Sequence, residues 1–261
     1  VADNCSEDFS DQLKQVDNIR LYYTQHLKGP SAARNLGAQK ATAPWLLFLD
    51  SDLYVEEGSF KAVWEFLADP GDYKAANGVD GPEALDSSNP HARYMALHCW
   101  RTFTLSRQDI TLFGTRHALI TRDLFYRLGE FSVAYEKADV EDYEFSIRLE
   151  KHSKVLKLQK FIFKHGYPGM TIQLKNYFRR ACLYAPLMHR RKNDGGATSM
   201  ATAFAIPFSL MGFVSLLAIP WLKVPALYGV LVFWGLALFS HSTFVKDIFI
   251  RESIVIFFRL S

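Results

Sequence analysis

The sequence has little cysteine and no cysteine pair at a metal-binding or redox spacing. Its three cysteines, Cys5, Cys99 and Cys182, lie far apart among 261 residues. This spacing excludes a disulfide framework and a cysteine-based zinc site, and it favours reduced thiols on a cytosolic face. The net charge is only +3, which is too small to indicate nucleic acid as a partner.

The chain also lacks an initiator methionine and a signal peptide. It opens with V-A-D-N-C-S-E-D and closes within an apolar run, S-I-V-I-F-F-R-L-S. We therefore expect a fragment of a longer protein, truncated at its N-terminus. Hydrophobic residues make up 49% of the chain, which suffices for a large core and excludes global disorder.

Acidic residues are absent between Gln173 and Asn193, where basic side chains accompany an apolar helical stripe. Residues 171–194 are therefore predicted to form a basic amphipathic helix on an anionic membrane surface. A solvated basic face on a core helix is the alternative. The basic residues are Lys175, Arg179, Arg180, Arg190, Arg191 and Lys192.

Residues 195–261 are predicted to be a transmembrane region, since charge nearly disappears over residues 197–245. Two apolar stretches, about 198–222 and 224–245, each reach the ~20 residues needed to cross a hydrocarbon core. We predict a transmembrane helical hairpin that turns at Lys223 and Pro225; a buried hairpin in a soluble protein is the alternative. Because basic residues flank the hairpin on both sides, the positive-inside rule puts residues 1–194 in the cytoplasm of a multi-pass cell-membrane protein.

Strand-like and helical patterns alternate over residues 1–170, which is typical of α/β layering. Residues 70–95 are rich in Gly, Pro, Asp and Ser and are expected to be a loop region around one short strand. Strands are predicted at 18–25, 45–50, 73–79 and 154–165. Helices are predicted at 29–43 (capped by Ser31), 56–69 and 139–152. Residues 110–131 are expected to form a strand that leads into a helix.

Asp50 and Asp52 end the buried run W-L-L-F-L, where an α/β sheet meets solvent and binds its ligands. Carboxylates so placed suit Mn²⁺ or Mg²⁺, which takes one or two of them and completes its shell with phosphate oxygens. By itself a D-x-D sequence is a weak signal, since many surface loops contain one.

The surrounding residues carry more information. The stretch G-P-S-A-A-R-N-L-G-A-Q-K-A-T-A-P-W-L-L-F-L-D-S-D resembles the central motif of family 2 glycosyltransferases, which have the GT-A fold. V-A-D-N-C-S-E-D, R-D-L-F-Y-R-L-G-E-F and E-D-Y-E-F-S-I-R-L are similar to three further family motifs, in the family's order. The resemblance implies an α/β, GT-A (Rossmann-like, mostly parallel sheet) catalytic domain over residues 1–170. Its first strand and helix would be missing, and an amphipathic interfacial helix and the hairpin would follow it.

The resemblance also implies roles for individual residues. Asp3, Arg34, Asp50 and Asp52 would bind the nucleotide-sugar donor. Asp50, Asp52 and His165 would hold Mn²⁺ or Mg²⁺, Asp142 would be the general base, and Glu141 would orient the acceptor or raise the basicity of Asp142. Asn4 departs from the family's aspartate, so the preferred nucleotide stays open.

The resemblance implies a sugar transfer with inversion. Transfer of a single sugar is expected, because the Q-x-x-R-W run of the processive synthases does not follow the domain. The membrane segments favour a lipid-linked acceptor, such as a polyprenyl phosphate or another lipid-linked glycan, and membrane lipids as partners. Arg116 and His117 are expected to line the acceptor cleft, and Arg148 to tie its helix to a loop.

Two other functions are weighed against this one. Aspartate-nucleophile phosphatases also end a buried strand in D-x-D, but they need a small residue where this chain has Tyr54. A catalytically inactive, membrane-anchored module that binds sugar nucleotides is the second, and the Glu141–Asp142 pair speaks against it.

Overall fold

The computed structural model of the chain describes residues 16–24, 29–105, 108–110, 112–135, 140–188 and 200–240. The chain divides into two compact units, Val1–Gly195 and Gly196–Ser261. The first contains α2 (Pro30–Lys40), β1 (Trp45–Leu49), β2 (Leu53–Val55), α3 (Phe60–Ala68), β3 (Ala75–Asp80), α4 (Pro90–Leu105), β4 (Asp109–Ile110), β5 (His117–Thr121), α5 (Arg122–Arg127), α6 (Glu141–Leu149), β6 (Val155–His165) and α7 (Met170–Met188), and the second contains α8 (Met200–Leu217), α9 (Ile219–Leu222) and α10 (Val224–Ser240).

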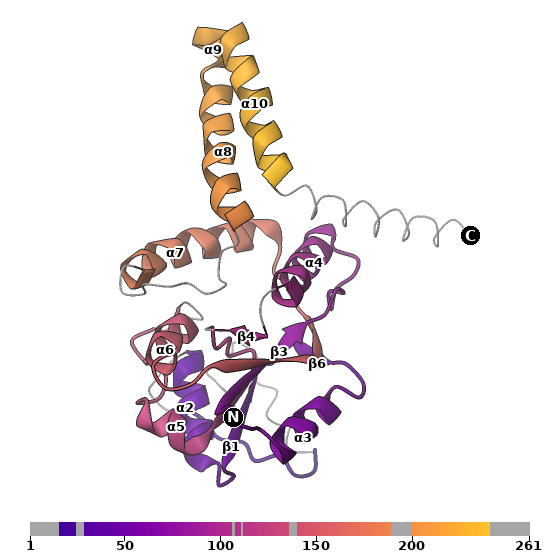
Figure 1. The fold of residues 1–261 in the computed structure, drawn as a ribbon, viewed down its shortest axis with the longest axis vertical. Helices are drawn as coiled ribbons and strands as arrows, with labels where there is room; N and C mark the ends of the chain where they lie inside the picture. Colours follow the sequence, from indigo (N-terminus) through magenta and orange to yellow (C-terminus); the bar gives the residue numbers. More distant parts are fainter. Residues whose placement is uncertain are drawn as a thin grey trace, which may run out of the picture. The chain divides into compact units, whose positions relative to one another are not determined.

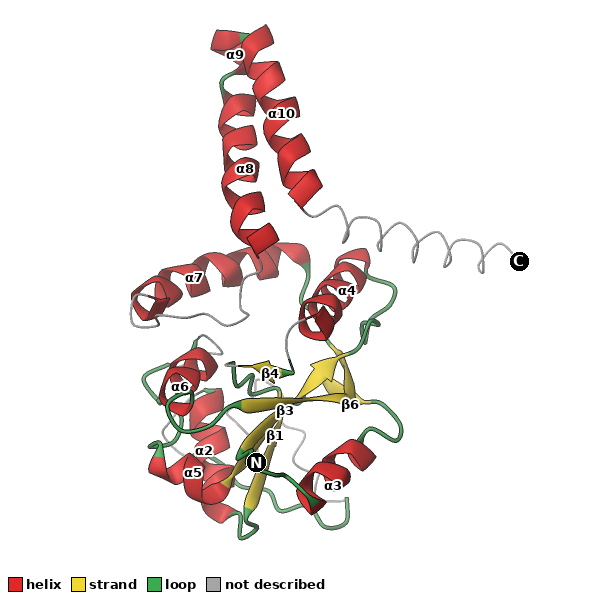
Figure 2. Cartoon of the chain, viewed as in Figure 1, coloured by secondary structure: helices red, strands yellow, loops and turns green. Residues whose placement is uncertain are grey.

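The first unit is built on one sheet with the strand order β1-β5-β3-β6-β2 and with β4 paired to β6 (Figure 2). Among the described strands, only β3 and β6 pair in parallel, and the remaining pairings are antiparallel. The prediction of a mostly parallel sheet is therefore wrong for this part of the chain. The reason lies in the long excursion through α4 and β4, after which β5 returns antiparallel to both β1 and β3.

The side chains of β1 alternate between two cores, because successive residues of a strand point to opposite faces of a sheet. Leu46 and Phe48 pack in a core with residues of α2, α5 and α6. Trp45 and Leu47 instead pack against the core that contains Val63 and Phe66 of α3. Figure 1 shows the same division, with α2, α5 and α6 on one side of the sheet and α3 on the other.

Most elements near the predicted site are confirmed: α2, α3 and α6 lie within the predicted helices, and β1, β3, β5 and β6 match the predicted strands. Ser31 is not the cap of α2, because the helix begins at Pro30 after Gly29, whose φ of 96° suits a glycine. The strand predicted at 18–25 is wrong, since the described residues there hold only an isolated bridge at Tyr23. The loop predicted to extend to residue 95 gives way to α4, which begins at Pro90.

In the second unit, α8 and α10 pack against each other, and α9 lies between them in sequence. Gly212 of α8 permits close contact, because a Cβ atom there would lie 2.1 Å from Cδ1 of Trp234. The chain turns at Lys223, whose φ is 47°, as predicted, whereas Pro225 lies in the first turn of α10 and not in the turn itself. Across the residues that the structure describes, no helix combines the length and the apolar character needed to cross a membrane. The predicted spans at 198–222 and 224–245 are therefore not confirmed.

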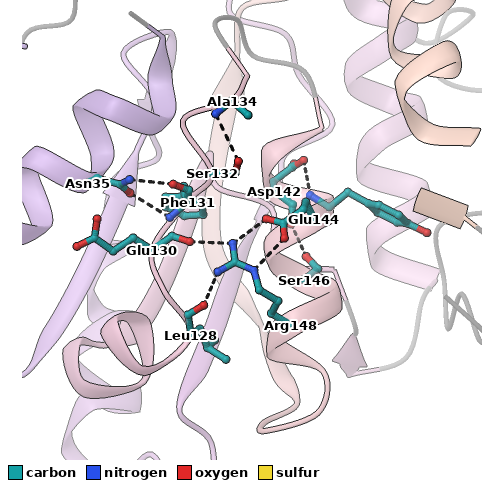
Figure 3. Close-up of polar contacts among 11 residues, drawn as sticks. Asn35, Leu128, Glu130, Phe131, Ser132, Ala134, Asp142, Glu144, Ser146 and Arg148 are labelled. Carbon is teal, nitrogen blue, oxygen red and sulfur yellow. Dashed lines mark hydrogen bonds and ion pairs between the residues drawn. The ribbon is translucent and has the colours of Figure 1, made fainter. Parts of the chain in front are cut away.

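Asn35 of α2 fixes the loop that precedes α6 (Figure 3). Its Nδ2 donates to the carbonyl oxygen of Phe131 at 2.9 Å, and its Oδ1 accepts the Phe131 N–H at 3.1 Å. The side chain is buried, so no water replaces these bonds when they are lost. The asparagine of the A-R-N-x-G motif therefore has a structural role.

Replacing Asn35 with Ala is expected to lower the free energy of unfolding by about 2–4 kcal/mol, because two buried backbone groups lose their partner. Gln39→Ala, at an exposed position of the same helix, is the matched control. Thermal unfolding of both variants checks the prediction, and equal melting temperatures would contradict it.

Candidate active site

Arg34 of α2 joins two carboxylates that lie far apart in sequence. Its Nη2 lies 2.6 Å from Oδ1 of Asp50, at the end of β1, and its Nη1 lies 3.0 Å from Oε1 of Glu141, at the start of α6. The Arg34 and Glu141 side chains are only 11% and 5% exposed, and that of Asp50 is 27% exposed. The structure thus brings together three of the predicted site residues around one guanidinium group.

Asp142 lies beside this network and is not part of its ion pairs. Its Oδ1 accepts the backbone N–H of Tyr143 at 2.7 Å. Burial, and next the charge of Glu141, raise the pKa of the Asp142 carboxyl to about 6, although the Tyr143 N–H, Arg34 and Arg180 act in the opposite direction. A carboxylate with this pKa is ionised at neutral pH and is more basic than an ordinary aspartate.

The first turn of α6 is held by Arg148, which lies near the end of the same helix (Figure 3). Its guanidinium donates to the carbonyl oxygens of Leu128 and Glu130 and pairs with Glu144 at 2.7 Å. The predicted link between helix and loop is confirmed. Together with Asn35, Arg148 fixes residues 128–131, which follow α5.

Asp52 and His165 form the second part of the site. Asp52 Oδ2 lies 3.3 Å from His165 Nε2, and the Asp52 side chain is 56% exposed. The Gly166 N–H also donates to the Asp52 carbonyl oxygen at 3.0 Å. An exposed carboxylate beside an imidazole is therefore fixed where β2 and β6 lie side by side.

The residues at this site suit a cation that is also bound by a phosphate group better than they suit a cation bound by protein ligands alone. Within the described parts of the chain, no group of three His, Cys, Asp or Glu side chains is arranged to hold a metal ion. The predicted trio is not assembled, because Asp50 pairs with Arg34 while Asp52 faces His165. An exposed Asp52 does suit Mg²⁺ or Mn²⁺, which binds one or two carboxylates and takes further oxygens from a diphosphate.

Sequence reasoning missed Asp80, a buried carboxylate at the end of β3. Its Oδ2 pairs with Arg116 Nη2 at 2.9 Å, and Arg116 Nη1 lies 3.5 Å from Nδ1 of His165. Asp80 is the last residue of a buried strand, much as Asp50 directly follows one, and that shared pattern is the signal that could have identified it. Arg116 therefore contacts the Asp52–His165 pair, while His117 is buried and stacks on Phe163, so His117 does not line a cleft.

Asp3 lies outside the described residues, as does the rest of its motif. Of the other predicted site residues, Arg34, Asp50 and Glu141 form one network with Asp142 beside it. Asp52 and His165 form a pair on the adjacent strands.

Parts of this chain are similar in sequence to known glycosyltransferases. Residues 1–129 match the model of the family described as Glycosyl transferase family 2. The chain is 32% identical over 94 residues to the "Pre-mycofactocin glycosyltransferase" of Mycobacterium tuberculosis, a match that covers 36% of this chain and 20% of that protein. It is 29% identical over 66 residues to an "Uncharacterized glycosyltransferase" of Haemophilus influenzae, covering 25% of this chain and 26% of that protein. The chain thus spans about a fifth to a quarter of these curated relatives.

Two solved structures are also similar. The mannosyltransferase PcManGT from Pyrobaculum calidifontis, in complex with GDP-Man and Mn²⁺, is 15% identical with a TM-score of 0.43, over 87% of this chain and 70% of that one. GalNAc-T7 with UDP, GalNAc and Mn²⁺ is 16% identical with a TM-score of 0.41, over 57% of this chain and 32% of that one.

The family match covers the motifs of the resemblance that lie before residue 130, whereas E-D-Y-E-F-S-I-R-L in α6 lies outside the matched residues. The expected α/β class is confirmed by the described sheet and the helices that flank it. The match over residues 1–129 supports a family 2 glycosyltransferase.

Proposed function

We propose that the chain is a metal-dependent, inverting glycosyltransferase that moves one sugar from a nucleotide donor to an acceptor at the cytoplasmic surface of a membrane. The observation that carries this proposal is the Arg34 network, which links Asp50 of the D-x-D sequence to Glu141 beside Asp142. The network thereby connects Asp50, which is suited to the leaving diphosphate, with the start of α6, where Asp142 is suited to the attacking hydroxyl.

Asp142 takes the acceptor hydroxyl's proton in this mechanism. Glu141 is not the base, because it is buried and its carboxylate is paired with Arg34. Transfer with inversion needs only one such carboxylate, on the side of the sugar opposite the leaving group. Asp52, with Asp50 nearby in sequence, would hold Mn²⁺ or Mg²⁺, which when bound neutralises charge on the departing diphosphate.

The rate of transfer is expected to rise about tenfold per pH unit below pH 6 and to level off above it, because Asp142 must be ionised to accept a proton. The charged groups that set this pKa are Glu141, Arg34 and Arg180. Single-turnover rates from pH 5 to 8 at saturating donor measure the profile. A flat profile over that range would contradict the assignment of Asp142 as base.

Two helices support contact with an anionic membrane. Neither α4 nor α7 contains an aspartate or glutamate. The helices touch through Tyr177, whose hydroxyl lies 3.6 Å from the Met95 sulfur. Exposed apolar side chains of α7 lie among basic residues of the same helix: Met170, Ile172, Leu174 and Tyr177 beside Lys175, Arg179 and Arg180. Acid-free helices with exposed apolar and basic side chains fit lipid headgroups of negative charge, and a lipid-linked acceptor would meet the site beside α7.

Replacing Lys175, Arg179 and Arg180 with Gln is expected to abolish a preference for anionic vesicles, since each basic residue near such a surface contributes about 1 kcal/mol. Flotation with phosphatidylcholine vesicles, with and without phosphatidylserine, measures that preference. The control carries Gln at three exposed lysines of the first unit, Lys61, Lys151 and Lys160. Equal loss in both variants would argue against α7 as the contact.

A thermal-shift screen of nucleotide sugars, with and without Mn²⁺, tests the donor half of the proposal. We expect one sugar nucleotide to raise the melting temperature, and only when Mn²⁺ is present. Binding without any turnover in the presence of membrane lipids would favour the alternative, a catalytically inactive sugar-nucleotide-binding module.

A further inference from the structure

Helix α7 lies against two other helices of the first unit (Figure 1). The hydroxyl of its Tyr177 lies 3.6 Å from the sulfur of Met95 in α4. Further along α7, Leu183 packs against Val140 and Tyr143, which lie on either side of the proposed base at the start of α6. The part of α7 between these two contacts therefore leads up to that base.

The side chains of α7 are arranged in the reverse of the usual order. A helix that packs on a domain normally buries its apolar side chains and exposes its polar ones. The large apolar side chains Met170, Ile172, Leu174 and Tyr177 of α7 are instead exposed. Among the described side chains of this helix, the half-buried ones include a single apolar residue, and they are Gln173, Asn176, Arg179, Arg180 and Leu183. Packing on an apolar core does not explain half-buried amides and guanidinium groups, whereas a polar ligand beside them does.

Three of these side chains form a polar row, Gln173, Asn176 and Arg180. Their spacings of three and four residues place them on one side of the helix. Leu183 continues the row and shows that this side faces α6. Electrostatics agrees with this direction: burial raises the pKa of the Asp142 carboxyl, and Arg180 is one of the charges that oppose the rise. The last member of the polar row is thus within electrostatic range of the proposed base.

We propose that the polar row of Gln173, Asn176 and Arg180 binds an acceptor that carries a phosphate group close to its attacking hydroxyl. A guanidinium group donates paired N–H bonds to two phosphate oxygens, and the two amides can bind further oxygens or hydroxyls of the same acceptor. The inference rests on the proposed function, because it names the acceptor of that reaction. It gives Arg180 a role in the site in addition to its place among the basic residues of α7.

Titration calorimetry of the whole chain in a neutral detergent, without any donor, tests the proposal. Geranylgeranyl phosphate is compared with geranylgeraniol, which has the same hydrocarbon chain and no charge. We expect the wild type to bind the phosphate at least about tenfold more tightly, because hydrogen bonds to charged groups contribute that much or more. Equal affinities would overturn the proposal. This comparison needs no substitution, so it decides the question even if a variant fails to fold.

Glycerol 1-phosphate and glycerol form the matching soluble pair. An Arg180-dependent preference for either phosphate ester over its alcohol supports the proposal. A stronger preference in the geranylgeranyl pair identifies a lipid as the source of the phosphate, and an equal preference in both pairs identifies a soluble acceptor.

Substitutions in the polar row provide the second readout. Arg180→Gln is expected to remove the preference for phosphate, whereas Arg180→Lys keeps the charge and should retain most of it. Gln173→Ala and Asn176→Ala are each expected to weaken binding about two- to tenfold. Arg127→Gln, which removes one exposed guanidinium group of α5, is the control. Wild-type preference in Arg180→Gln, wild-type affinity in both alanine variants, or an equal loss in Arg127→Gln would overturn the proposal.

The titrations contain no nucleotide sugar, so they separate this proposal from the proposed function. If no donor binds in the presence of Mn²⁺, the proposed function fails, whatever the result with phosphate esters. If a donor binds and its sugar is transferred but neither phosphate ester is preferred, only the phosphate site on α7 is refuted.

Discussion

Asp142→Asn is expected to reduce sugar transfer by about 10²- to 10⁴-fold, the contribution typical of a general base. The substitution removes the group that accepts the proton and leaves the shape of the site unchanged. The Asn side-chain oxygen can still accept the Tyr143 N–H. Asp52 and the Arg34 network are untouched, so Mn²⁺-dependent donor binding is expected to stay within about twofold, a shift of about 0.4 kcal/mol.

The same variant should also be more stable than the wild type at neutral pH. The pKa of Asp142 is raised to about 6 in the folded chain, against about 4 in an unfolded one. The folded chain therefore binds this proton more tightly, and the group's contribution to stability falls as the pH rises from about 4 to 6. Asparagine removes that penalty above pH 6, so a melting temperature a few degrees higher is expected.

Single-turnover assays and thermal unfolding of Asp142→Asn measure both effects. Glu150→Gln, which removes an exposed carboxylate just after the same helix, is the control and should keep full activity. Transfer at the wild-type rate by Asp142→Asn would eliminate it as the base. A large fall in its melting temperature would mean that the carboxylate stabilises the fold.

Arg34→Met is expected to cost about 3–5 kcal/mol of folding stability, the usual result of removing one partner from a buried ion pair. The variant would leave Glu141, which is 5% exposed, without its guanidinium, and Asp50 would lose the same partner. For a chain of this size, the loss corresponds to a melting temperature lower by about 6–20 °C. Transfer should fall as well, because α6 would no longer be tied to the end of β1.

Two further variants separate the lost charge pairing from the lost packing. Arg34→Met combined with Glu141→Gln removes the uncompensated buried charge and should recover much of the stability. Arg127→Met breaks the exposed ion pair with Asp123 and should cost less than about 1 kcal/mol. If Arg34→Met melted at the same temperature as Arg127→Met, the Arg34 network would have no structural role.

Local sequence predicted the elements that carry the site. The run W-L-L-F-L and the helix after Gly29-Pro30 have strong periodic and boundary signals, and both are confirmed as β1 and α2. The direction of strand pairing was not predictable, since β5 is placed by the residues between 81 and 116, whose path depends on tertiary packing. The helix α4 lies within that stretch and was missed for the same reason.

The contacts within the site were predicted less well than its residues. Arg34 was expected to bind the nucleotide-sugar donor, and its guanidinium lies between Asp50 and Glu141, the latter 107 residues away in sequence. No local pattern reports a pairing over that separation. Asp80 went unnoticed because its strand is short and lies in a region of turn-forming residues, and its importance depends on the contact with Arg116.

Release of nucleoside diphosphate from labelled nucleotide sugars, with Mn²⁺ and membrane lipids present, is the most direct test of the central claim. The proposed function predicts that one donor yields nucleoside diphosphate and labelled glycolipid in equal amounts, and that Asp142→Asn reduces both together. No release from any donor, or equal release by the wild type and Asp142→Asn, would contradict it.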